Sequence, residues 1–218
     1  MMTPPLLLGH RGARANKSFP ENTLESFDQA LADGCDGFEF DVRLSADGQA
    51  VIHHGSIVRR KRIAHRKAAN LNLPTLAGVL ERYAHRAFLD IELKVPGLEQ
   101  ITAELLQKYP LKTGGVVSSF LPKVLQTLSA TAPSTPLGLI CETPRQLAAW
   151  RDLPVQYVIP HRKLATEKLI GELHAAEKKI LVWTVNNGKE MRKLAALMVE
   201  GIISDKTVLL SQTLKSQA

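Results

Sequence analysis

Two carboxylates interrupt an apolar run in the first fifth of the sequence. The segment GFEFDVRL at 37–44 is typical of a β-strand in which Glu39 and Asp41 alternate with apolar residues. Because side chains at i and i+2 of a strand point to the same face, the two acids share one face and the apolar residues the other. A buried carboxylate is costly unless it is paired, hydrogen-bonded or bound to a metal. The sequence therefore predicts a neutralising partner for Glu39 and Asp41.

Other residues capable of chemistry lie at or just after the ends of the other apolar runs of the chain. They are His10, Arg11, Glu92, Lys94, Ser118, Ser119, Phe120, Trp183, Ser204 and Asp205. Three carboxylates suit a hard divalent cation such as Mg²⁺ or Ca²⁺. Arginine and lysine beside such an ion suit a phosphoryl group, and paired histidines suit proton transfer.

Each feature taken alone also has a structural explanation. Glu39 and Asp41 could be salt-bridged residues of the sheet, and Glu92 with Lys94 in DIELK could be a simple ion pair. A single histidine after a strand is more often structural than catalytic. The order and spacing of all these residues together favour a functional site.

The elements that must position these residues alternate regularly along the chain. Apolar runs typical of strands lie at 6–9, 36–42, 87–93, 115–119, 137–140, 155–159, 179–185 and 201–204, with a further run at 50–54 that we interpret as an excursion after the second strand. Amphipathic segments typical of seven helices lie between them, the first at 22–34 with Asn22 or Thr23 as its cap.

Repeated β–α units predict a parallel sheet, and eight of them in a chain of this length favour a single (β/α)8 TIM barrel over residues 1–218. A doubly wound open sheet is the alternative, although no glycine-rich fingerprint follows the first strand. In either fold, chemistry is expected at the carboxyl ends of the strands.

The composition is that of an ordinary globular protein. The chain has 218 residues, of which 44% are hydrophobic and 22% charged, and no apolar run approaches the length of a membrane-spanning helix. The N-terminal segment lacks a basic region and a cleavage site, so it reads as a first strand instead of a signal peptide. With only two cysteines, Cys35 and Cys141, we expect a reducing, cytoplasmic setting.

Positive charge is concentrated in one segment. The run RRKRIAHRK at 59–67 contains six arginines and lysines and no acid, and the formal net charge of the whole chain is +7. Such a run attracts phosphate on a small molecule, on a lipid surface or on nucleic acid, or it forms a solvated loop. Nucleic-acid binding is disfavoured, because the run has no interleaved aromatic residues and no known motif.

The motifs in their running order resemble one known family. GHRG, PENTLESFDQAL, GFEFDVRLSADG, DIELK, SSF, WTVN and IISD follow one another from Gly9 to Asp205 as they do in the glycerophosphodiester phosphodiesterases. The resemblance implies a (β/α)8 barrel that hydrolyses glycerophosphodiesters to glycerol 3-phosphate and an alcohol. It also implies that Glu39, Asp41 and Glu92 hold the divalent metal of the family.

The resemblance further assigns roles to individual residues. His10 matches the first catalytic histidine, Arg11 and Lys94 match contacts to the phosphate, and Trp183 matches an aromatic residue near the glycerol moiety. The second histidine of the family follows an Asp-Gly turn by six positions, which after Gly48 selects His54 in preference to His53. The two histidines are expected to act as general acid and base. Arg60 falls where the family usually carries an arginine.

The chain also departs from the family pattern. Gly55 replaces the aspartate that normally follows the second histidine, the basic run replaces a threonine-rich stretch, and the connection from His54 to Glu92 is short. These departures leave two alternatives, a catalytically weakened barrel that acts as a binding or regulatory protein and a phosphodiesterase for a related lysophospholipid. The expected partner is a small-molecule glycerophosphodiester, without nucleic acid or stable membrane insertion.

Overall fold

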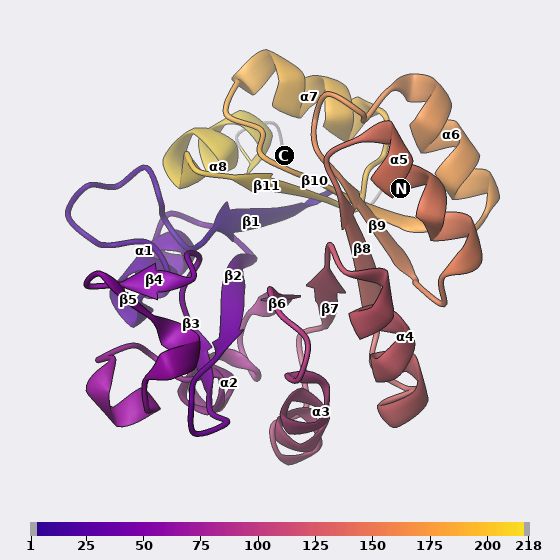
Figure 1. Ribbon diagram of the computed structural model, residues 1–218. Coiled ribbons are helices and arrows are strands. Elements are labelled where there is room, and N and C mark those ends of the chain that lie inside the picture. Colours follow the sequence, from indigo (N-terminus) through magenta and orange to yellow (C-terminus); the bar gives the residue numbers. More distant parts are fainter. Residues whose placement is uncertain (1–3, 216–218) are drawn as a thin grey trace.

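Eight parallel strands form a closed barrel in the computed structural model, which describes residues 4–215 (Figure 1). The strands are β1 (Leu6–His10), β2 (Gly37–Leu44), β6 (Phe88–Leu93), β7 (Gly115–Ser119), β8 (Leu137–Cys141), β9 (Tyr157–Pro160), β10 (Lys179–Val182) and β11 (Gly201–Ser204). The ring closes because β1 pairs in parallel with both β11 and β2. The predicted TIM barrel is therefore confirmed, and the open-sheet alternative is excluded.

Helices follow the barrel strands and cover the outside of the barrel, and all but the last connect one barrel strand to the next (Figure 1). They are α1 (Leu24–Ala32), α2 (Leu76–Tyr83), α3 (Glu99–Lys108), α4 (Pro122–Thr131), α5 (Pro144–Ala148), α6 (Glu167–Ala175), α7 (Gly188–Ala196) and α8 (Thr207–Lys215). Several begin at side-chain caps, as the sequence indicates. Thr23, and not Asn22, caps α1 by accepting a hydrogen bond from the Ser26 amide. No helix among residues 4–215 has the length and apolar character needed to cross a bilayer.

The main core lies between the barrel wall and the helices. Phe38 and Phe40 of β2 point outward into it, where Phe38 stacks on Phe27 of α1 with ring centroids 4.3 Å apart and meets Tyr83 of α2 edge-on. A smaller apolar cluster fills the inside of the barrel, with Leu8, Val116 and Ile203 among its buried members. The alternation along β2 thus buries its aromatic residues outside and turns its acids toward the barrel interior.

The connection between β2 and α2 carries extra structure. A short strand, β3 (Ala50–Ile52), pairs antiparallel with β2, which confirms the expected excursion. Beyond it lies a small hairpin of β4 (Ile57–Val58) and β5 (Lys61–Arg62), followed by two 3₁₀ turns at Ile63–His65 and Ala68–Asn70. The predicted run at 50–54 therefore ends earlier as a strand, and His53 and His54 lie just beyond its end.

Candidate active site

A cavity of about 260 Å³ lies at the carboxyl ends of the barrel strands. Its lining consists of His10, Arg11, Glu39, His54, Asp90, Glu92, Lys94, Phe120, Ile140, Glu142, Ile159, Trp183 and Ile203. The lining includes seven of the residues expected from the sequence, namely His10, Arg11, Glu39, His54, Glu92, Lys94 and Trp183. Asp41 is fully buried next to Glu39 and Glu92.

Three acidic side chains form a compact cluster at its base. Glu39, Asp41 and Glu92 each offer one carboxylate oxygen, and these oxygens lie within 4.8 Å of one another. The register of the sheet produces this arrangement, because Asp41 of β2 is directly opposite Glu92 of β6 and the two strands are parallel. All three side chains are buried, so their mutual repulsion is poorly screened by water.

The charges in this cluster are incompletely balanced. Burial and repulsion from Asp41 raise the pKa of Glu92 to about 8, and the same causes raise the pKa of Glu39 well above its usual range. Burial also opposes the ionisation of Asp41, but Lys94 and Arg11 outweigh it and lower the pKa of that carboxyl. In addition, Glu39 Oε1 is buried without a hydrogen-bond partner among residues 4–215. Oxygen donors with an excess of buried negative charge fit a hard divalent cation.

Two cationic side chains lie beside the acids at the cavity. Lys94 Nζ is 2.7 Å from Glu92 Oε1 and 3.2 Å from Asp41 Oδ1, so the ion pair considered for Glu92 and Lys94 is present. Arg11 Nε is 3.2 Å from Asp41 Oδ2, and Arg11 Nη1 donates to Glu21 Oε1 at 2.8 Å. Because both cations line the cavity, they can contact an anion bound beside the acids.

The two histidines reach the cavity from separate segments of the chain. His10 ends β1, and its Nε2 is 3.8 Å from Glu39 Oε2. His54 lines the cavity beyond β3, and partial burial lowers its pKa. The ring of His53 instead forms a 2.8 Å hydrogen bond with the backbone oxygen of Gly55 and does not line the cavity. The structure thus places the histidine selected by the Asp-Gly spacing at the cavity and its neighbour outside it.

The opposite wall of the cavity is apolar. Trp183 and Phe120 meet edge-to-face with ring centroids 5.7 Å apart, and Trp183 Nε1 donates to the backbone oxygen of Ile159 at 2.9 Å. This hydrogen bond fixes the indole ring against the mouth of the barrel. Arg60, which the resemblance singles out, is exposed and is not part of the lining.

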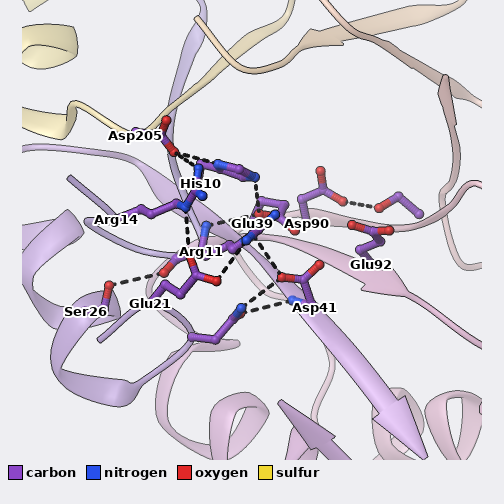
Figure 2. A network of polar contacts seen from close by, with 12 residues as sticks. His10, Arg11, Arg14, Glu21, Ser26, Glu39, Asp41, Asp90, Glu92 and Asp205 are labelled. Atoms are coloured by element: carbon purple, nitrogen blue, oxygen red, sulfur yellow. Dashed lines mark hydrogen bonds and ion pairs between the residues drawn. The ribbon is translucent and has the colours of Figure 1, made fainter. Parts of the chain in front are cut away.

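A network of polar contacts surrounds His10, Arg11 and the acidic cluster (Figure 2), and it includes residues to which the sequence assigns no role. Asp205 Oδ1 lies 2.7 Å from His10 Nδ1, and Asn22 Nδ2 donates to Asp41 Oδ2 at 2.8 Å. Asp90 is fully buried, accepts a hydrogen bond from Ser118 Oγ, and has a pKa that burial raises to about 7. The period of two along β6 contains the signal for Asp90, since it precedes Glu92 by two positions. Nothing in the local sequence pairs Asp205 with His10.

The chain is similar to known proteins over most of its length. The Glycerophosphoryl diester phosphodiesterase family matches residues 10–114 and 67–209. A glycerophosphodiester phosphodiesterase of Bacillus altitudinis is 28% identical over 91% of this chain and 94% of its own length.

Solved structures share the fold over nearly the whole chain. An Oleispira antarctica phosphodiesterase, solved in complex with the product sn-glycerol-3-phosphate, superposes with a TM-score of 0.85 and 25% identity over 97% of both chains. A glycerophosphodiester phosphodiesterase from Thermotoga maritima, at 24% identity, has the same fold with a TM-score of 0.82 over 97% of this chain and 99% of its own. The chain therefore belongs to the glycerophosphoryl diester phosphodiesterase family of enzymes.

Proposed function

We propose that this protein hydrolyses glycerophosphodiesters to glycerol 3-phosphate and an alcohol with the help of a divalent metal ion. The observation that carries the proposal is the single cavity that gathers two histidines, two cations and the acidic cluster at the mouth of a barrel of this family. The product bound by the Oleispira relative is the one expected here.

The acidic cluster is the proposed metal site. Glu39, Asp41 and Glu92 would hold the ion, and hard oxygen donors favour Mg²⁺ or Ca²⁺. When bound, such an ion supplies electrostatic stabilisation for the charge that develops on phosphoryl oxygens. It would also relieve the repulsion that raises the pKa values of Glu39 and Glu92.

Arg11 and Lys94 are the proposed phosphate contacts. Each is already paired with a carboxylate of the cluster, so each is held in place before the substrate arrives. The guanidinium of Arg11 presents several donors in one plane, which suits two oxygens of one phosphate. Trp183 would close the opposite side of the cavity against the glycerol carbons, where an apolar ring surface displaces water.

His10 and His54 are the proposed proton-transfer pair. One would remove the proton from the attacking hydroxyl, and the other would protonate the departing alcohol. Both line the cavity and belong to separate segments of the chain, His10 at the end of β1 and His54 beyond β3. The burial that lowers the pKa of His54 favours its neutral form near neutral pH.

The test is direct hydrolysis with defined substrates. Purified protein is incubated with glycerophosphocholine, glycerophosphoethanolamine or glycerophosphoglycerol in Mg²⁺, Ca²⁺ or Mn²⁺, and glycerol 3-phosphate is assayed. We expect its release with at least one pair of substrate and metal and its loss in excess chelator. Absence of product in every combination would overturn the activity, and full activity after verified metal removal would overturn the metal dependence.

A further inference from the structure

The β4–β5 hairpin carries an unusual density of exposed charge. Arg59, Arg60, Lys61 and Arg62 are all exposed, and among residues 4–215 none of them forms an ion pair. No acidic residue occurs in the segment 59–67, which also contains Arg66 and Lys67. The positive field of the hairpin is therefore uncompensated by its own segment and available to a partner.

The turn of this hairpin is occupied by residues that disfavour its shape. Arg59 has φ of 46° and Arg60 has φ of 62°, so both lie in the left-handed region. Two-residue hairpin turns with this backbone strongly prefer Asn-Gly, because β-carbons are crowded there. Local conformation thus does not explain two consecutive arginines at the tip. Strained backbone of this kind is concentrated at functional sites.

The hairpin stands on the same end of the barrel as the active site but outside its cavity. It belongs to the connection from β2 to α2, and connections from a strand to the following helix lie at the carboxyl end of the barrel (Figure 1). No residue from 57 to 67 lines the catalytic cavity. These cations therefore lie outside the cavity in which a small substrate would bind between Arg11 and Lys94.

Exposed apolar surface accompanies the charge. Ile57 of β4 is 55% exposed, and it borders a groove of about 450 Å³ that Arg62, His65, Val95 and Pro96 also line. Leu121 in the β7–α4 connection, at the same end of the barrel, is 36% exposed. Binding a water-soluble anion would leave Ile57 exposed to water. A surface with anionic groups over an apolar layer would bind the arginines and also bury the isoleucine.

We propose that the β4–β5 hairpin docks the protein on an anionic phospholipid bilayer. Arg59, Arg60, Lys61 and Arg62 would contact lipid phosphates, and Ile57 would enter the level of the headgroups. Each basic residue near such a surface raises the binding constant about fivefold. Firm attachment of a polybasic segment also requires an apolar group that enters the membrane. Docking in this way would turn the mouth of the catalytic cavity toward the membrane. The proposal concerns binding and does not depend on the proposed activity.

The experiment measures co-sedimentation with phosphatidylcholine vesicles that contain or lack phosphatidylglycerol. We expect binding only to the anionic vesicles and a loss of binding as salt is raised. The double variant Arg59→Asn/Arg60→Gly places the residues preferred by the turn there while removing two charges. It should bind roughly 25-fold more weakly at low salt, with a melting temperature equal to or above that of the parent.

Matched controls separate the hairpin from net charge. Arg192→Gln/Lys193→Gln removes two exposed cations from α7 and should bind like the parent. Ile57→Ser keeps every charge and should weaken binding at high salt more than at low salt. Absence of parent binding to anionic vesicles, or an equal loss in the α7 control, would overturn the proposal.

Other partners give different results. Retention on duplex DNA without vesicle binding would identify nucleic acid as the partner and overturn the proposal. A raised KM for a soluble glycerophosphodiester in Arg59→Asn/Arg60→Gly, with unchanged vesicle binding, would show that the hairpin steers substrate instead. We expect kcat and KM for that soluble substrate to match the parent at ordinary salt.

Discussion

His10 Nδ1 lies 2.7 Å from Asp205 Oδ1, although 195 residues separate the two in the sequence. Closure of the barrel makes this contact, because Gly9 of β1 is opposite Ser204 of β11. Arg14 and Asn186 also donate to Asp205. Burial opposes the ionisation of Asp205, but its hydrogen bond with His10 and its other partners hold the pKa of that carboxyl well below its usual range. An ionised partner at Nδ1 keeps a proton on that nitrogen and directs Nε2 toward the cavity.

Replacing Asp205 with Asn should therefore impair catalysis through His10. The amide can stabilise the wrong tautomer of the imidazole, so we expect kcat to fall by about 10²-fold or more while KM changes little. Nitrogen NMR of the His10 ring should show the altered tautomer directly. Arg14→Gln is the matched control, since it removes another partner of Asp205 without touching the ring, and its effect should be much smaller. A kcat of Asp205→Asn within twofold of the parent would refute this positioning role.

The two adjacent histidines should differ sharply when truncated. His54 lines the cavity, so His54→Ala should lower turnover by about 10²-fold or more. His53 is held by the Gly55 backbone oxygen outside the cavity, so His53→Ala should change turnover much less. Steady-state kinetics of both variants with one glycerophosphodiester provides the measurement. The opposite ranking would mean that the Asp-Gly spacing selects the wrong histidine.

The barrel could be predicted because each of its strands is marked by a short apolar run in the sequence. The expected runs at 115–119 and 201–204 coincide with β7 and β11, since buried parallel strands are short and continuously apolar between turn residues. The sequence does not predict the β4–β5 hairpin, because strands of only two residues, Ile57–Val58 and Lys61–Arg62, are too short to show an apolar run or alternation. Helix α8, which follows the last strand, is not among the seven helices that the sequence predicts.

Part of the site could also be predicted from the sequence, and part could not. Residues at the carboxyl ends of strands could be gathered from sequence, because the barrel topology brings all such ends together. The contacts of Asp205 with His10 and of Asn22 with Asp41 join separate elements through side-chain geometry. Periodicity assigns a residue to a face, but it does not select its partner on another element. The pairing therefore required the three-dimensional structure.

Two glycines should respond oppositely to the addition of a methyl group. A β-carbon on Gly37 would lie 1.9 Å from the backbone oxygen of Phe88, so Gly37→Ala should force β2 and β6 apart and destabilise the fold by about 3 kcal/mol or more. A β-carbon on Gly171 of α6 would meet nothing within 4 Å, so Gly171→Ala should stabilise by about 0.5–1 kcal/mol. Urea unfolding measures both. A stable Gly37→Ala variant would contradict the close approach of the two strands.

Buried acids at the barrel mouth should make stability depend on pH and metal together. Burial raises the pKa of Glu92 to about 8 and that of Asp90 to about 7, whereas unfolded carboxyls ionise near their ordinary values of about 4. Between these limits the folded state binds more protons than the unfolded state, so stability falls as pH rises. Asp41, whose pKa is lowered, contributes the opposite slope only below that window. His54, whose pKa burial lowers, also opposes the fall, but only up to about pH 6.5, the ordinary value for histidine.

In excess chelator, the melting temperature should therefore fall between about pH 5 and about pH 8, most clearly above about pH 6.5, where His54 no longer opposes the fall. Added Mg²⁺ or Ca²⁺ should raise it most at the upper end, because a metal binds the deprotonated carboxylates and replaces the protons. Asp90→Asn keeps the shape of the buried side chain but removes one titrating group, so its slope in chelator should be shallower while its response to metal remains. Glu92→Gln should lose much of both effects, since Glu92 belongs to the acidic cluster. A melting temperature that is flat or rises across this window in chelator would show that the pKa values of Glu92 and Asp90 are not raised in the metal-free protein.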